Sequence, residues 1–206
     1  LRRPTHASRV FDADRFEVCN QKWSAVAEEN AGVAVLNDCK YGLNVEGGNI
    51  QLTLLRSTMA PDMRADQGRQ DFTYAVYAWT GSFGESQVVR EGYELNAPVR
   101  VRQGEAGSAS LFAVGSPAVI LETVKPAEDG SGEVILRLYE SLRSTVTCTL
   151  LTELPVDRAW SVNLIEEQPR PLPVKKGAIE LTFRPFEIKT IRLRFKKAGS
   201  VTGSRV

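Results

Sequence analysis

The chain has 206 residues, of which 42% are hydrophobic and 25% are charged, a composition that is typical of a globular protein and excludes an intrinsically disordered one. Its 26 Lys and Arg and 25 Asp and Glu leave a formal charge of +1, so charge points to neither nucleic acid nor a membrane surface as a partner. All apolar runs are shorter than the ~20 residues that cross a bilayer.

The counts of histidine and cysteine limit the chemistry of the chain. His6 is the single histidine, so it cannot supply a two-His zinc site, and a Ser-His-Asp triad would have to use it. The widely spaced Cys19, Cys39 and Cys148 contain no CxxC pair and fit free thiols in a reducing compartment. We therefore expect buried thiols rather than nucleophiles, no metal site in this chain and, because no secretory signal opens it, a cytoplasmic location.

The two ends differ in character from the middle of the chain. Residues 1–14 are polar and irregular and predict an N-terminal linker, and residues 196–206 are small and polar and predict a disordered tail. Between them, Phe16 and Val18 open a short strand, and the apolar run Gly32–Leu36 predicts a buried strand.

A hairpin, a loop, a strand and a helix follow in the first half. Apolar residues alternate from Leu43 to Leu54 around the turn residues Gly47 and Gly48, which predicts a β-hairpin. Residues 56–69 lack periodicity and predict a long polar loop. Residues 72–78 predict a strand, and residues 85–95 are the only convincing helical stretch, ended by the Asn-Ala-Pro that follows.

The second half predicts strands almost throughout, at residues 119–123, 134–139, 145–151, 160–164, 179–183 and 191–195. About ten strands, one short helix and no strand–helix alternation favour an all-β fold, an antiparallel β-sandwich over residues 15–195 with a possible subdivision near residues 100–115. Arg192 and Arg194 alternate with apolar residues and predict the solvated side of an edge strand.

The long polar loop is the first candidate site. Asp62 and Asp66 lie four residues apart, with Arg56 nearby, and two carboxylates ~5–9 Å apart can hydrolyse a glycoside. The alternative is a solvated loop in which Asp and Arg neutralise each other, and the sequence favours this alternative.

The turn after the buried strand is the second candidate site. Asn37, Asp38, Lys40 and Tyr41 crowd into it, and such polar groups beside an aromatic ring can bind a sugar. The alternative, which the sequence favours, is that Asn37 and Asp38 make local backbone turns while Tyr41 packs on the neighbouring hairpin. For Trp23, Trp79 and Trp160 we expect core or inter-domain contacts rather than ligand platforms.

Several motifs along the chain form one recognisable pattern. The chain carries Arg2-Arg3-Pro4-Thr5-His6, then Leu36-Asn37-Asp38-Cys39-Lys40-Tyr41-Gly42, Ala60-Pro61-Asp62, Ala65-Asp66-Gln67-Gly68, Leu136-Arg137-Leu138-Tyr139-Glu140 and Phe186-Glu187-Ile188-Lys189-Thr190. In this order, over about residues 1–195, they resemble the C-terminal part of glycoside hydrolase family 38 α-mannosidases, nearest to the cytosolic and bacterial branch.

The resemblance implies that this chain is one part of a larger enzyme whose catalytic groups lie in other domains. Family members are retaining α-mannosidases in which an α/β barrel carries the aspartate nucleophile, the aspartate acid/base and a zinc or other divalent ion, followed by a helical bundle and β-sandwich domains of galactose-mutarotase-like, supersandwich type. None of the nucleophile or metal motifs occurs here. The resemblance thus implies an inactive C-terminal domain that packs on the barrel and bundle and shapes the cleft for a mannose-containing oligosaccharide.

Under this resemblance Asn37, Asp38, Lys40, Tyr41, Arg56, Asp62 and Asp66 are expected to bind or position substrate, and no residue is expected to be catalytic. Two alternatives stay open. A free-standing carbohydrate-binding β-sandwich module predicts an exposed aromatic strip, and a non-catalytic interaction domain predicts no sugar binding at all.

Overall fold

A computed structural model describes residues 5, 8–11, 16–104 and 107–196, so His6 and much of the predicted linker and tail lie outside the described residues. The chain divides into two compact units, Leu1–Gln103 (unit 1) and Gly104–Val206 (unit 2). The boundary lies inside the interval of residues 100–115 in which the sequence predicts a possible subdivision.

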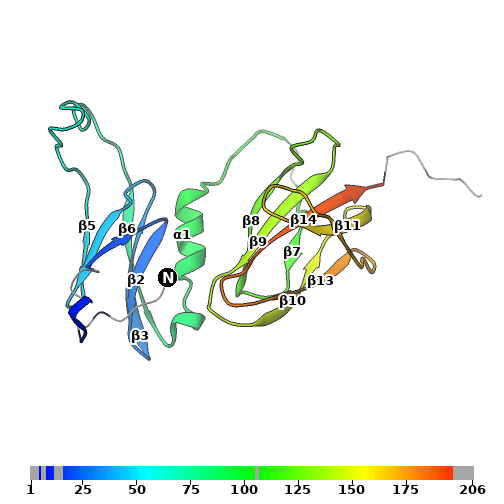
Figure 1. The fold of residues 1–206 in the computed structure, drawn as a ribbon, viewed down its shortest axis with the longest axis horizontal. Coiled ribbons are helices and arrows are strands. Elements are labelled where there is room, and N and C mark those ends of the chain that lie inside the picture. Colours follow the sequence, from blue (N-terminus) through cyan, green and yellow to red (C-terminus); the bar gives the residue numbers. More distant parts are fainter. Residues whose placement is uncertain (1–4, 6–7, 12–15, 105–106, 197–206) are drawn as a thin grey trace, which may run out of the picture. The chain divides into compact units, whose positions relative to one another are not determined.

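Unit 1 contains two three-stranded antiparallel sheets, ordered β1-β4-β5 and β2-β3-β6, and one helix (Figure 1). The elements are β1 Glu17–Cys19, β2 Trp23–Ala27, β3 Ala31–Asn37, β4 Gly42–Glu46, β5 Asn49–Leu52, β6 Tyr74–Thr80 and α1 Val88–Asn96. The predicted hairpin is confirmed, because β4 pairs with β5 and places Leu43 opposite Leu52. Gly47 and Gly48 close it with φ of 55° and 86°, as a two-residue hairpin turn requires.

The helix begins three residues later than the sequence predicts. Glu85 ends a short 3₁₀ turn, Phe83–Glu85, in which its carboxylate accepts hydrogen bonds from the backbone N–H and hydroxyl of Ser82, at 3.0 and 2.8 Å. Ser86 is then extended, with φ −73° and ψ 156°, so α1 starts only at Val88. Within the described residues, no helix is long and apolar enough to span a bilayer.

One face of the β2-β3-β6 sheet packs against α1 (Figure 1). Its core consists of Ala34, Leu36, Trp79 and Val88. The Trp79 ring lies so close to β3 that a Cβ atom on Gly32 would sit 2.1 Å from it. Glycine is therefore required at residue 32 because the indole occupies the space of a side chain.

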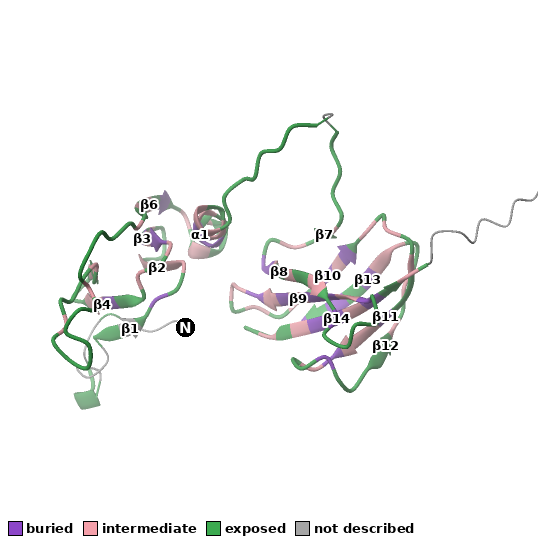
Figure 2. Ribbon diagram, turned by 90° about the horizontal axis from the view of Figure 1, so that it is seen from above, coloured by how far each residue is buried: buried purple, intermediate pink, exposed green. Residues whose placement is uncertain are grey.

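Unit 2 is a β-sandwich of a three-stranded sheet, β13-β10-β7, and a five-stranded sheet, β12-β11-β14-β9-β8. The strands are β7 Ala113–Val114, β8 Val119–Pro126, β9 Val134–Glu140, β10 Val146–Leu151, β11 Val156–Val162, β12 Arg170–Leu172, β13 Ala178–Phe183 and β14 Ile188–Phe195. Both sheets contribute to one core, in which Leu136, Leu150, Phe183 and Leu193 are fully buried. Figure 2 shows buried positions in purple on strands of both sheets. The predicted fold class, antiparallel β-sheets in a β-sandwich with one short helix, is confirmed, with the described sandwich in unit 2 and the helix in unit 1.

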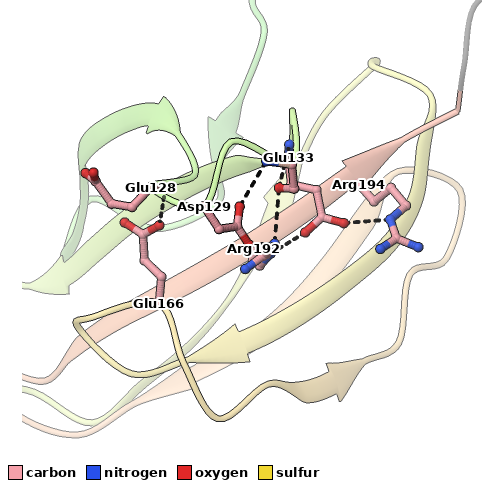
Figure 3. A network of polar contacts seen from close by, with 7 residues as sticks. Glu128, Asp129, Glu133, Glu166, Arg192 and Arg194 are labelled. Atoms are coloured by element: carbon pink, nitrogen blue, oxygen red, sulfur yellow. Dashed lines mark hydrogen bonds and ion pairs between the residues drawn. The ribbon is translucent and has the colours of Figure 1, made fainter.

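The prediction of an edge strand at Arg192 and Arg194 is wrong. Strand β14 is the middle strand of the five-stranded sheet, between β11 and β9. The guanidinium of Arg192 pairs with Glu133 and lies 2.6 Å from the Asp129 carboxylate, and Arg194 donates to Glu133 at 2.6 Å (Figure 3). The two arginines can therefore lie on the middle strand of the sheet because they form ion pairs with the turn after β8.

A buried carboxylate fixes one end of unit 2. Glu140 is fully buried, and its two oxygens accept hydrogen bonds from the backbone N–H groups of Leu142, Arg143, Ser144 and Phe186 at 2.8–3.0 Å. Burial alone would raise the pKa of Glu140, but these hydrogen bonds outweigh it and the pKa is lowered.

Candidate functional site

The turn that follows β3 is held by hydrogen bonds at its first residue. Asn37 is fully buried, and its side-chain oxygen accepts the backbone N–H of Lys40 at 2.7 Å. Its backbone carbonyl accepts a hydrogen bond from the side-chain amide of Asn96, at 3.0 Å, at the end of α1. The local backbone turn expected for Asn37 is confirmed, and α1 adds a second anchor.

Asp38 fastens the turn to the segment before β6. Its carboxylate accepts the backbone N–H of Thr73 at 2.9 Å. The pKa of Asp38 is lowered, first by a hydrogen bond from the Cys39 thiol and then by the Thr73 N–H. The same contact raises the pKa of the Cys39 thiol, so less thiolate forms at neutral pH and Cys39 is a poor nucleophile.

The second half of the turn presents a cation and an aromatic ring. The Lys40 Nζ lies 4.7 Å from the centroid of the Phe72 ring, and that ring stacks on Tyr74 at 6.5 Å. Tyr41 is 57% exposed, so it does not bury itself against the neighbouring hairpin as the favoured alternative expected. The backbone carbonyls of both turn residues are held by the buried Asn20, whose side chain donates to Lys40 at 3.0 Å and whose N–H donates to Tyr41 at 3.1 Å.

The long polar loop is organised by Asp66. One carboxylate oxygen of Asp66 accepts the backbone N–H groups of Arg56 and Ser57, at 3.0 and 2.6 Å. These two hydrogen bonds lower the pKa of Asp66, and the charge of Lys40 lowers it further. Asp62 instead accepts the N–H of Arg64 at 2.8 Å, a contact confined to its own turn.

The structure thus joins part of the set of residues that the sequence singles out. Asp66 of the loop accepts the backbone N–H of Arg56, and the charge of Lys40 in the turn contributes to the lowered pKa of Asp66. Asn37 and Asp38 support the turn from within. Two supporting residues, Asn20 and Asn96, were missed, because each acts on the turn from a distant position in the chain.

Neither Asp38 nor Asp66 has the raised pKa that the acid of a glycosidase requires. A glycosidase keeps one carboxyl protonated near neutral pH by raising its pKa. The pKa values of Asp38 and Asp66 are lowered, so both carboxylates are ionised and can only accept hydrogen bonds or pair with cations. Among the described residues, no group of three or more His, Cys, Asp or Glu side chains is arranged to hold a metal ion.

The remaining candidates have structural positions. Trp79 is buried, and Trp23 packs against its cluster, as predicted, whereas Trp160 is half-buried under the Arg194 guanidinium at 5.2 Å. All three thiols are free, but only Cys148 is buried, so the expectation of buried thiols is wrong for Cys19 and Cys39.

A shallow hollow in unit 2 offers no further chemistry. Its lining side chains include no titratable group, and they are Val162, Asn163, Leu164, Ile165, Ile188 and Thr190. It therefore has no acid, base or charged metal ligand to offer a substrate.

Two family descriptions match this chain. Residues 1–64 match the glycosyl hydrolases family 38 C-terminal domain, and residues 118–191 match the glycosyl hydrolases family 38 C-terminal beta sandwich domain. The class of protein is therefore a C-terminal β-sandwich region of a glycoside hydrolase.

Similar proteins agree with these matches. Human Alpha-mannosidase 2C1 is 43% identical over 94% of this chain and 19% of its own length, and Alpha-mannosidase G of Dictyostelium discoideum is 36% identical over 93% and 18%. A crystal structure of an alpha-mannosidase from Enterococcus faecalis V583 has the same fold, with a TM-score of 0.69, 21% identity and coverage of 94% of this chain and 23% of its own. The chain belongs to the C-terminal region of family 38 α-mannosidases and spans about a fifth of the length of the curated relatives.

Proposed function

We propose that the chain is the C-terminal β region of an α-mannosidase that hydrolyses terminal α-mannosides with retention, and that it has no catalytic activity of its own. The relatives that carry the name alpha-mannosidase support the activity of the parent polypeptide, meaning the longer protein to which this region belongs. The lowered pKa values of Asp38 and Asp66 support the inactivity of the region, because neither carboxyl can act as a general acid.

The residues that break the glycosidic bond then belong to the rest of the parent polypeptide. By the family resemblance, a barrel supplies the nucleophile, the acid/base and a zinc or other divalent ion, and a helical bundle connects it to the β region. We propose the barrel and bundle as the intramolecular partners, and a mannose-containing oligosaccharide as the ligand. The free thiols favour the cytoplasm as the compartment.

The proposed role of this region is to position substrate beside the cleft. The single observation that carries this role is that the turn presents the Lys40 ammonium group and the exposed Tyr41 ring together; the charge of Lys40 also lowers the pKa of Asp66 in the loop. An ammonium group and a carboxylate can hydrogen-bond hydroxyls of the sugar beyond the bond that is cleaved, and the exposed Tyr41 ring can stack on it. Asn37 and Asp38 hold the backbone that presents these groups.

Replacing Lys40 in the parent polypeptide tests this role. For Lys40→Met we expect a several-fold higher KM for a mannose oligosaccharide and an unchanged kcat, because the lysine binds beyond the cleaved bond. Arg69→Met is the matched control, since Arg69 is 86% exposed and pairs only locally with Asp71 at 2.9 Å. Equal KM values for both variants would contradict the role.

A carbohydrate-binding module is the second candidate, because Tyr41 and Tyr74 are exposed by 57% and 54%. It predicts measurable binding in a calorimetric titration of the isolated chain with mannose or mannobiose. Our proposal predicts no heat of binding, since the rest of the sugar site belongs to other parts of the parent polypeptide. A non-catalytic interaction domain also predicts no heat of binding, but it predicts no change in KM for Lys40→Met.

A further inference from the structure

The β2-β3-β6 sheet of unit 1 has an apolar face that no described element covers. The side chains opposite the α1 side form rows across the three strands: Val26, Val33 and Ala78 in one, and Ser24, Val35 and Val76 in the next. Tyr74 lies in the adjoining row. We call this surface the valine face, with Val26, Val33, Val35, Tyr74, Val76 and Ala78 as its members.

The valine face is open in unit 1. Val76 is 70% exposed, Tyr74 is 54% exposed and Val33 is 43% exposed. None of the six members carries a charge. A contiguous apolar surface without charges is the composition of a protein contact rather than of a solvated surface.

The sequence of these strands also indicates a sheet that is covered on both sides. Gly32–Leu36 in β3 and Tyr74–Trp79 in β6 are unbroken runs of glycine, apolar and aromatic residues, whereas a half-buried strand alternates apolar and polar residues. Strand β13 of unit 2 alternates in this way, with the burial of Ile179, Leu181 and Phe183 and the exposure of Glu180 and Thr182. Among the described residues of unit 1, α1 covers one side of this sheet and no element covers the other side.

We propose that the valine face is the surface on which unit 1 docks against the part of the parent polypeptide that precedes this region. The inference rests on the proposed function, because it requires a parent polypeptide. The human relative has more than four times the length that matches this chain, since the match covers 19% of it, and both family descriptions place the matched region at the C-terminal end. The preceding segment is a large covalently linked partner whose proximity removes most of the entropic cost of association.

Hydroxyl-radical footprinting read by mass spectrometry tests the inference. We expect Tyr74 and Val76 to be modified rapidly in the isolated chain and several-fold more slowly in the intact parent polypeptide. Equal modification rates in the two samples would overturn the inference. Protection that appears in the isolated chain as its concentration rises would also overturn it, because a second copy would then be the occupant.

A pair of aspartate variants gives an independent readout. Val76→Asp is expected to lower the melting temperature of the parent polypeptide by more than that of the isolated chain, because only the parent would bury the new charge. Val101→Asp is the control, since Val101 is 90% exposed and outside every strand, and its shift should be equal in both samples. Equal shifts for Val76→Asp would count against the docking surface.

The activity of the same parent preparation on an aryl α-mannoside separates this inference from the proposed function. A parent that turns over the mannoside while Tyr74 and Val76 stay unprotected overturns the docking surface alone. A parent without turnover that protects both residues supports the docking surface and overturns the proposed activity alone.

Discussion

Among the described residues, the β2-β3-β6 sheet of unit 1 and the five-stranded sheet of unit 2 each have a face that no second sheet or helix covers, and these two faces differ in chemistry. The valine face of unit 1 is apolar, and four of its six members, Val33, Tyr74, Val76 and Ala78, are exposed. The corresponding face of the five-stranded sheet in unit 2 carries Arg192 and Arg194, each paired with a carboxylate (Figure 3). Lys125 on the same face pairs with Glu166.

The difference indicates what each face contacts. In unit 2 the turn after β8 folds back, and Glu133, only 5% exposed, lies between two guanidinium groups. The two guanidinium groups compensate the charge of this nearly buried carboxylate, so this face of the sheet does not need a further layer of protein to cover it. The valine face has no such groups, so burying it is favourable by about 25 cal/mol per Å² of apolar surface removed from water.

The largest predicted effect concerns a contact within unit 2, the buried carboxylate of Glu140. Glu140→Gln should lower the free energy of unfolding of unit 2 by about 3 kcal/mol, because the amide NH₂ group cannot accept the backbone N–H groups that Glu140 holds. Urea unfolding followed by the fluorescence of Trp160, the one tryptophan of unit 2, measures this. Glu180→Gln, at an exposed position on β13, is the control, and equal losses would refute the anchoring role.

The next effect concerns the covered side of the sheet in unit 1. Gly32→Ala should cost about 2 kcal/mol, because the new Cβ would displace the Trp79 ring from its place against β3. The free energy of unfolding is measured in a chain that also carries Trp160→Phe, so that tryptophan fluorescence reports on unit 1 alone. Gly104→Ala, with no atom within 4 Å of its Cβ, should have little effect. A neutral Gly32→Ala would mean that the indole packs loosely.

A smaller effect is expected from acid on the charged face of unit 2. Arg192 holds the pKa of Asp129 down at about 2, and Arg192 and Arg194 lower the pKa of Glu133 against the opposing effect of burial. A carboxyl group whose pKa is lower in the folded protein than in the unfolded protein stabilises the fold at every pH above its unfolded pKa. This contribution to stability is lost as the pH falls through the pKa of the folded protein. We expect the melting temperature of unit 2 to fall between pH of about 4.5 and 2, and to fall less steeply in Arg192→Met. Parallel curves for both proteins would contradict the pairing.

The smallest effect is expected on the valine face itself. Val76→Thr in the isolated chain should change the free energy of unfolding by less than about 0.5 kcal/mol, because Val76 is 70% exposed there. Urea denaturation of Val76→Thr in a chain that also carries Trp160→Phe, followed by tryptophan fluorescence, measures this change. A loss of several times that size would show that the face is already covered within this chain.

Patterns that depend on near neighbours in sequence were predicted well. The hairpin around Gly47 and Gly48 was found because turn residues and alternation lie within one short stretch. The helix start was placed too early because Glu85, a good helix former, instead bonds back to Ser82. In the same way, the turn at Asn37 was expected from its own residues.

Features that depend on distant parts of the chain were not predicted. The position of β14 in the middle of its sheet follows from strand order, which the alternation around Arg192 does not encode. The Asn20 and Asn96 contacts with the turn join residues 20 and 59 positions apart. The run Gly32–Leu36 predicted a buried strand, and the exposure of Val33 differs from that pattern because one covering layer lies outside this chain under our proposal.

The assignment of bond cleavage to the rest of the parent polypeptide is tested most directly by one assay. Hydrolysis of an aryl α-mannoside in the presence of zinc is measured for the isolated chain and for the parent polypeptide. We predict turnover by the parent and only the buffer rate for the chain, because Asp38 and Asp66 are ionised and hold backbone groups. Hydrolysis by the isolated chain that disappears in Asp66→Asn would contradict this assignment.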